Sequence, residues 1–154
     1  MQRVLSDELR VARGWFVFAL GLLLSVSGCQ CGFVSYGRKA MAREATVNLE
    51  RIAQAELAYW KTRRTFRKAG PSPARVPGNT KARFEDPEGA FREIGFQPET
   101  GYVWYQYEVA IESTRTAVVI ARGDLNGDGI QSEFRLNIEA ERPVGAVIAS
   151  NQLE

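Results

Sequence analysis

The chain has 154 residues and a formal net charge of +2. This length fits one globular domain with a short additional segment, and the balanced charge gives no overall field that would attract nucleic acid. The sequence contains no His, and its two cysteines are Cys29 and Cys31. The chain beyond Cys31 therefore lacks a disulfide, a thiol nucleophile and a Cys/His zinc site.

No charged residue lies between Arg13 and Arg38. The run between them, GWFVFALGLLLSVSGCQCGFVSYG, is rich in Leu, Phe and Val, and about 20 such residues span a bilayer as a helix. We expect residues 1–13 to form a cytoplasmic leader and residues 14–37 an apolar membrane anchor or signal segment. Residues 38–154 are then a globular domain held at the membrane outside the cytoplasm, in the periplasm or at the cell surface.

Three kinds of anchor fit this run. An uncleaved transmembrane helix would be bracketed by the basic residues at its two ends. The stretch Val26-Ser27-Gly28-Cys29 resembles the bacterial lipobox, in which small residues precede the Cys that receives the lipid, so Cys29 is a lipidation candidate. The pair Gly14-Trp15 resembles a class III signal, in which a peptidase cuts after Gly and leaves an aromatic N-terminus.

A helix is predicted from Met41 to Phe66, because this segment has no Pro or Gly and is rich in good helix formers. At 100° per residue its apolar side chains fall on one arc, which would pack on a sheet: Ala45, Leu49, Ile52, Ala53, Leu57, Tyr59 and Trp60. Glu56 lies near the centre of that arc. Its carboxylate needs a partner there: a backbone N–H, a Tyr, an Arg, a neighbouring subunit or water.

The predicted helix ends in the basic run KTRRTFRK, residues 61–68. Cations at this end favour the negative pole of the helix dipole, and a surface for acidic partners is the alternative. Aromatic interleaving is limited to Phe66, so we expect no nucleic-acid partner.

The second half of the chain predicts a loop and then antiparallel strands. Four of the six prolines lie in residues 70–87, which predicts an irregular surface loop, followed by a short helix at 88–94. Strands are expected at 102–112, 116–123 and 133–139, with a weaker fourth at 145–149. In the first of them, Tyr105, Tyr107, Val109 and Ile111 are expected to face the core. The fold class is therefore α+β, with a long N-terminal helix whose apolar half lies in the membrane and whose amphipathic half packs on a sheet of three to four strands.

The turn Asp124-Leu125-Asn126-Gly127-Asp128-Gly129 joins the second and third predicted strands. Its spacing matches the first half of an EF-hand loop, so Asp124, Asn126 and Asp128 are candidate Ca²⁺ ligands, with Glu133 as an addition. Arg135 occupies the twelfth position, where a full EF-hand has Glu. Asn-Gly and Asp-Gly also favour a plain hairpin turn, and this alternative stays open.

Taken together, these segments resemble the type IV pilin or pilin-like (fimbrial) protein family. The resemblance spans roughly residues 40–140 and depends on the segment AREATVNLERIAQAELAYW, the Gly95-Phe96-Gln97-Pro98 run and the hairpin ARGDLNGDGIQSEF. It implies a long helix on an antiparallel sheet, no catalytic activity and assembly through helix packing. Some relatives bind Ca²⁺ in the C-terminal region. One departure is Ala19, the fifth residue after the Gly14 cleavage candidate, where filament-forming pilins usually carry Glu.

The function that we expect is that of a membrane-anchored, pilin-like structural subunit or an accessory of pilus or secretion assembly. Its partners would be the membrane and other pilin-like subunits or assembly proteins. The alternative is a lipoprotein or membrane-anchored binding module outside the cytoplasm, stabilised by Ca²⁺ and not part of a fibre. An enzyme is not expected, because the sequence shows no nucleophile–base pair, phosphate loop or metal triad.

Overall fold

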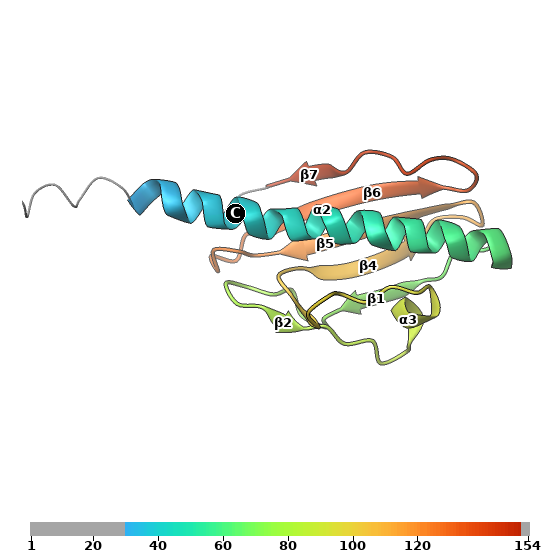
Figure 1. Ribbon diagram of the computed structural model, residues 1–154, viewed down its shortest axis with the longest axis horizontal. Coiled ribbons are helices and arrows are strands. Elements are labelled where there is room, and N and C mark those ends of the chain that lie inside the picture. Colours follow the sequence, from blue (N-terminus) through green and yellow to red (C-terminus); the bar gives the residue numbers. More distant parts are fainter. Residues whose placement is uncertain (1–29, 152–154) are drawn as a thin grey trace, which may run out of the picture. The chain divides into compact units, whose positions relative to one another are not determined.

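The computed structural model describes residues 30–151 of the chain, and the residues from Gly37 onward form one compact unit. The helix α2 (Gln30–Arg63) is followed by the strands β1 (Ala69–Ser72) and β2 (Ala82–Arg83) and the short helix α3 (Ala90–Glu93). The strands β3 (Tyr102–Val103), β4 (Gln106–Ile111), β5 (Thr116–Gly123), β6 (Ser132–Glu139) and β7 (Ile148–Ser150) complete the order. Within this unit, α2 lies across one face of the main sheet (Figure 1).

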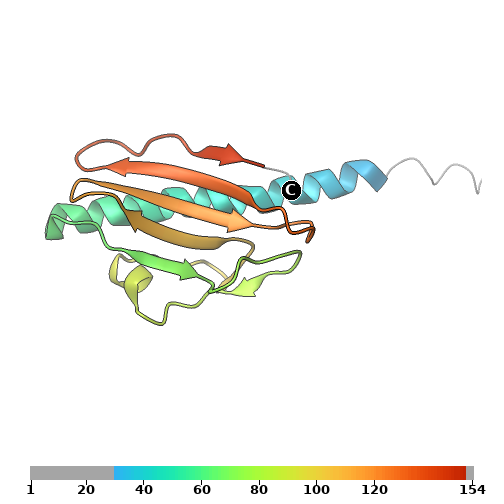
Figure 2. The same cartoon turned by 180° about the vertical axis from the view of Figure 1, so that it is seen from behind.

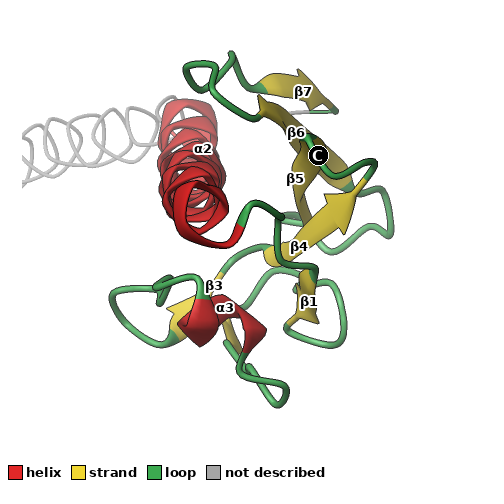
Figure 3. Ribbon diagram, turned by 90° about the vertical axis from the view of Figure 1, so that its right-hand side faces the viewer, coloured by secondary structure: helices red, strands yellow, loops and turns green. Residues whose placement is uncertain are grey.

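The α+β fold class is confirmed for this unit: a single helix packs on an antiparallel sheet, and the end-on view separates the two layers (Figure 3). The buried face of α2 contains the predicted apolar positions Leu49, Ile52, Ala53 and Trp60. Leu57 and Tyr59 are half-buried at its margin. Burying this face against the sheet stabilises the helix, because most of the stability of a helix in a protein comes from the packing of its amphipathic face.

The main sheet has five strands in the order β1-β4-β5-β6-β7, and every neighbouring pair is antiparallel. The central strand β5 pairs with β6 from Thr116↔Glu139 to Gly123↔Ser132, and its bounds are those expected from the sequence. Five of its residues in succession, Ala117 to Ala121, are buried. A strand that is covered on both faces consists of successive apolar residues, which explains the unbroken apolar sequence from Ala117 to Ala121.

The expectation of three to four strands was wrong, because the segment predicted as an irregular loop supplies β1. This strand pairs with β4 at Ala69↔Val109 and Ser72↔Tyr107, with a register shift between the two pairs. Pro71 lies in it, and a proline is tolerated at a sheet edge, where its missing N–H is not needed by a second neighbour. The same segment supplies β2, which pairs with β3 in a separate two-stranded sheet.

Three further expectations were wrong in detail. Ile111 does not face the core but is 43% exposed, since β4 ends there, whereas Tyr105, Tyr107 and Val109 are fully buried. The fourth expected strand forms later, as β7. The short helix α3 covers only the middle of the predicted 88–94 segment, where the Asp86 carboxylate accepts a hydrogen bond from the Arg92 N–H at 2.9 Å.

Candidate functional site

The acidic turn between β5 and β6 is closed by its own side chains. The Asp124 carboxylate accepts hydrogen bonds from the backbone N–H groups of Gly127 (2.8 Å) and Gly129 (3.0 Å). The Asp128 carboxylate accepts one from the Ile130 N–H at 2.7 Å and one from the Asn126 side-chain amide at 2.8 Å. Gly127 and Gly129 have positive φ angles, which glycine adopts without steric cost. The backbone of the turn therefore explains why glycine occupies both positions.

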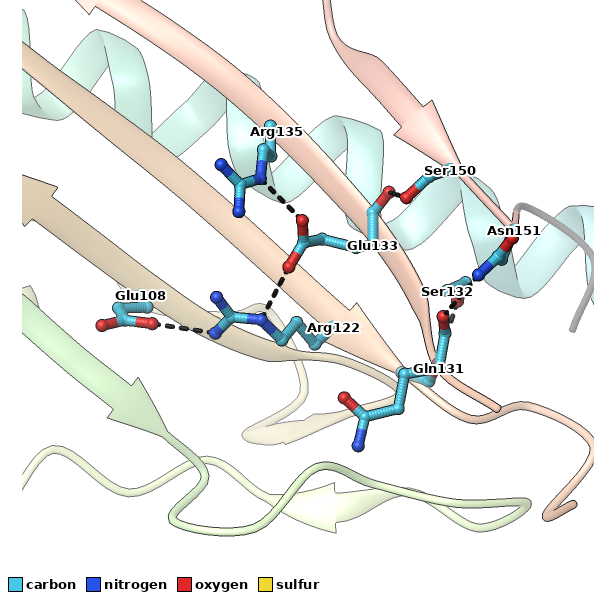
Figure 4. A network of polar contacts seen from close by, with 9 residues as sticks. Glu108, Arg122, Gln131, Ser132, Glu133, Arg135, Ser150 and Asn151 are labelled. Carbon is cyan, nitrogen blue, oxygen red and sulfur yellow. Dashed lines mark hydrogen bonds and ion pairs between the residues drawn. The ribbon is translucent and has the colours of Figure 1, made fainter. Parts of the chain in front are cut away.

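Glu133, the fourth candidate Ca²⁺ ligand, belongs to a different cluster. Its carboxylate accepts hydrogen bonds from Arg122 at 2.8 Å and from Arg135 at 2.6 Å, and Arg122 also reaches Glu108 at 2.9 Å (Figure 4). Despite the burial of its carboxyl, these two Arg residues hold the pKa of Glu133 below its usual value. Among residues 30–151 the structure assembles no group of three or more His, Cys, Asp or Glu side chains that could hold a metal ion.

This cluster lies on the face of the sheet that α2 does not cover, and its long side chains shield apolar residues of β5. Ile120 is paired with Glu108 on β4 and Arg135 on β6, and it is only 6% exposed. The aliphatic stems of Arg and Glu bury such apolar neighbours while their charged ends stay in water. The outer face of the sheet therefore presents a charged surface above a buried apolar row.

Glu56 is fully buried on the face of α2 that meets the sheet. Its Oε2 accepts a hydrogen bond from the backbone N–H of Arg67 at 3.0 Å, which supplies the partner that the sequence required. Its Oε1 has no hydrogen-bond partner among the described residues. Burial raises the pKa of Glu56 to about 7, against the lowering effect of the Arg67 N–H and charge.

The basic run at the end of α2 is partly neutralised by carboxylates. Arg67 pairs with Glu93 at 2.8 Å, and Arg64 pairs with Glu141 at 3.6 Å. The Arg64 guanidinium also lies 5.0 Å from the centre of the Trp60 ring, and the Trp60 indole donates a hydrogen bond to the Thr114 carbonyl at 3.0 Å. The last turn of α2 is thus fastened to the loops at this end of the domain.

A second polar cluster fixes the earlier part of α2 to the start of β4. The Glu44 carboxylate accepts a hydrogen bond from the Trp104 N–H at 2.7 Å and pairs with Lys81 at 3.4 Å. Asn48, which is 6% exposed, donates from its side-chain amide to the Tyr107 hydroxyl at 3.0 Å. Both Glu44 and Asn48 belong to the helical segment 41–66, but no pattern in the sequence distinguished them from the solvent-facing positions.

Glu44, Asn48 and Lys81 also line a groove of about 290 Å³ between α2 and the segment 98–103. We call it the α2 groove and define it by its lining: Ala40, Arg43, Glu44, Val47, Asn48, Arg51, Lys81, Pro98, Glu99, Thr100, Tyr102 and Val103. Sequence reasoning missed it, because its walls come from segments that are far apart in the chain.

The candidate processing sites Gly14, Trp15 and Cys29 lie outside the described residues, as does most of the predicted anchor. Within the part of the chain that the structure describes, no helix combines the length and apolarity that crossing a membrane requires. The anchor and its three alternatives therefore stay predictions.

No protein-family model matches the chain, and no curated protein or solved structure matches it either.

Proposed function

We propose that the chain is a membrane-anchored, pilin-like structural subunit, or an accessory of pilus or secretion assembly, that acts through protein–protein contacts. The observation that carries the proposal is the extent of α2. This helix begins at Gln30, inside the predicted anchor 14–37, and ends at Arg63, after a buried face that packs on the sheet. A tether that continues directly into the first element of a domain gives that domain a defined attachment point.

The side chains that the structure brings together support a scaffold role. The network of Glu44, Lys81, Asn48 and Tyr107 and the contact of Glu56 with Arg67 both fasten α2 to the rest of the domain. Each of these groups is engaged in holding the helix. We therefore propose contacts and no catalysis, with the membrane and other pilin-like subunits or assembly proteins as partners and the domain outside the cytoplasm.

The alternative is a lipoprotein or membrane-anchored binding module that does not enter a fibre. The sequence Val26-Ser27-Gly28-Cys29 favours it, because a lipid on Cys29 would anchor the chain a few residues before the compact unit that starts at Gly37. In that case the membrane-embedded part would be the lipid, and residues 1–28 would be removed.

One experiment separates these proposals: intact mass spectrometry of the chain recovered from the membrane fraction of the expressing cells. A mass starting at Trp15 supports a pilin-like subunit, a diacylglycerol mass on Cys29 supports the lipoprotein, and an intact Met1 supports the uncleaved transmembrane helix. Recovery of the full-length chain only in the aqueous fraction after detergent phase separation contradicts the membrane anchor in every form.

A further inference from the structure

The lining of the α2 groove is charged, and a segment of opposite charge could bind in it. Arg43, Arg51 and Lys81 lie along it with Glu44 and Glu99, so cations outnumber carboxylates. Arg51 is 3.8 Å from Glu99, which is itself highly exposed, and Arg43 forms no ion pair with any residue of the described part. Two large apolar side chains of the groove, Val47 and Tyr102, are exposed by 44% and 53%.

The acidic turn carries the opposite charge to the groove. The carboxylates of Asp124 and Asp128 bind only N–H groups of the turn itself, and within residues 30–151 neither of them forms an ion pair with a cation. Residues 124–131 contain no Lys or Arg. Ile130, next to these carboxylates, is 51% exposed. The turn thus presents two uncompensated negative charges beside an apolar side chain.

The groove and the turn lie at the same end of the domain. The Glu44 carboxylate in the groove accepts a hydrogen bond from the N–H of Trp104, which lies two residues before β4. The first residue of β4, Gln106, pairs with Arg122 near the end of β5. The acidic turn follows β5 immediately. In Figures 1 and 2, the connection from β5 to β6 lies at the end of the sheet where the chain enters this unit, near Gly37.

We propose that the acidic turn of one copy docks in the α2 groove of a second copy, so that neighbouring copies associate side by side through two different surfaces. The inference rests on the proposed function, because copies anchored in one membrane hold their chain-entry ends at the same height, and both surfaces lie at that end. Asp128 would approach Arg43, and Ile130 would cover Val47 and Tyr102. A contact between two different surfaces extends into a ring or a filament, since a pair joined in this way still has one unused groove and one unused turn.

The test uses photo-crosslinking of the full-length chain in its own membrane fraction. A benzophenone amino acid replaces Val47 in one population and Ala58 in a control population, because Ala58 is an exposed position of the same helix outside the groove. Each population is mixed with isotope-labelled copies before illumination, so that crosslinks between copies are recognised by mass. We expect crosslinked dimers from position 47, mapped to residues 124–131 of the other copy.

Variants that reverse the charges of the two surfaces provide a second test. Arg43→Glu should lower the dimer yield from position 47 by about fivefold, the ratio expected when about 1 kcal/mol of charge complementarity is lost. The double variant Arg43→Glu/Asp128→Lys should restore it, because the pair is reversed but still complementary. Arg92→Glu changes the net charge equally at an exposed site outside the groove and should leave the yield unchanged.

Three results overturn the inference: equal yields from positions 47 and 58, crosslinks that map to another segment or another protein, or a double variant that is not restored. Each of these results is measured on the chain that has been recovered in the membrane fraction. Failure of the contact is therefore distinct from failure of the anchor, which would leave no chain in that fraction.

Discussion

Glu56 and Arg67 are joined by a hydrogen bond of 3.0 Å from the Arg67 backbone N–H to Glu56 Oε2, across the turn that ends α2. The Arg67 side chain points to a different partner, Glu93, which also accepts a hydrogen bond from the Tyr59 hydroxyl at 2.8 Å. One residue of the turn thus connects a buried carboxylate with an exposed one. The connection fixes the direction in which the chain leaves α2 for β1.

Stability should fall as the pH rises from 4.5 to 7. In this window the folded state holds a proton on Glu56, whose pKa burial raises to about 7, and the unfolded state has lost it. The folded state then binds more protons, so the free energy of unfolding decreases with pH, by about 3 kcal/mol in total. Below this window the slope reverses, because the lowered pKa values of Glu93 and Glu133 stabilise the fold only while these groups are ionised.

Urea unfolding of the full-length chain in detergent, followed by Trp fluorescence, measures this dependence. Glu56→Gln should abolish the fall between pH 4.5 and 7, because an amide cannot ionise. Glu50→Gln is the matched control on the exposed face of the same helix and should keep it. A fall of equal size in Glu56→Gln would assign the titration to another group.

Gly123→Ala should destabilise the domain by about 1–3 kcal/mol, the usual cost of an overpacked core. A Cβ at this position would lie 2.8 Å from the Tyr105 ring and 3.0 Å from the Trp104 carbonyl oxygen. Gly145→Ala is the control, since its Cβ would approach no atom closer than 3.5 Å and should change stability by less than about 0.5 kcal/mol. Equal losses in thermal unfolding of the two variants would contradict the packing at Gly123.

Arg122→Met should cost about 1 kcal/mol, because it leaves Glu108 without the cation that it contacts at 2.9 Å. Arg135→Met should cost less, since Glu133 would keep Arg122. The charges of this cluster are partly exposed, so the difference between the two variants should shrink when unfolding is measured in 1 M salt. A difference that persists at high salt would point to packing over Ile120 as its source.

Calcium binding by the acidic turn remains a prediction and has a direct test. Asp124, Asn126 and Asp128 offer too few oxygens for a tight site, so we expect a dissociation constant on the order of 1 mM. At 10 mM Ca²⁺ such a site stabilises the fold by about 1.4 kcal/mol, which should raise the melting temperature by roughly 3–6 °C. Asp128→Asn should abolish the shift. Glu133→Gln should retain it, because the Glu133 carboxylate is committed to Arg122 and Arg135.

An unchanged melting temperature of the wild-type chain in Ca²⁺ would identify the sequence D-x-N-x-D-G as a turn that its own side chains close. The hydrogen bonds of Asp124 to the Gly127 and Gly129 N–H groups already account for a plain hairpin with this spacing.

Periodicity predicted the parts of the fold that depend on neighbouring residues. The arc of α2 and the bounds of β5 follow from a repeated apolar pattern, and the requirement of Glu56 for a partner follows from its place on that arc. β1 could not be predicted in this way, because a strand containing Gly70 and Pro71 depends on the neighbour that it pairs with, Val109 among others.

The α2 groove is the clearest case of what periodicity leaves out. Lys81 and Tyr102 line the same groove as Arg43 and Val47, although they lie in distant segments of the chain. The spacing of residues within one segment cannot predict which distant segments come together. The exposure of Val47 and Tyr102 is likewise known only from the folded structure.

The edge strand β1 also limits how copies of this protein join one another. Pro71 lacks the amide hydrogen that a further strand would require, and the register shift between Ala69 and Ser72 interrupts a regular ladder. Backbone pairing between the β1 edges of two copies, a route by which proteins with exposed edge strands aggregate, is therefore disfavoured. If the chain is anchored at a membrane, as we propose, its self-association would then be decided by side chains.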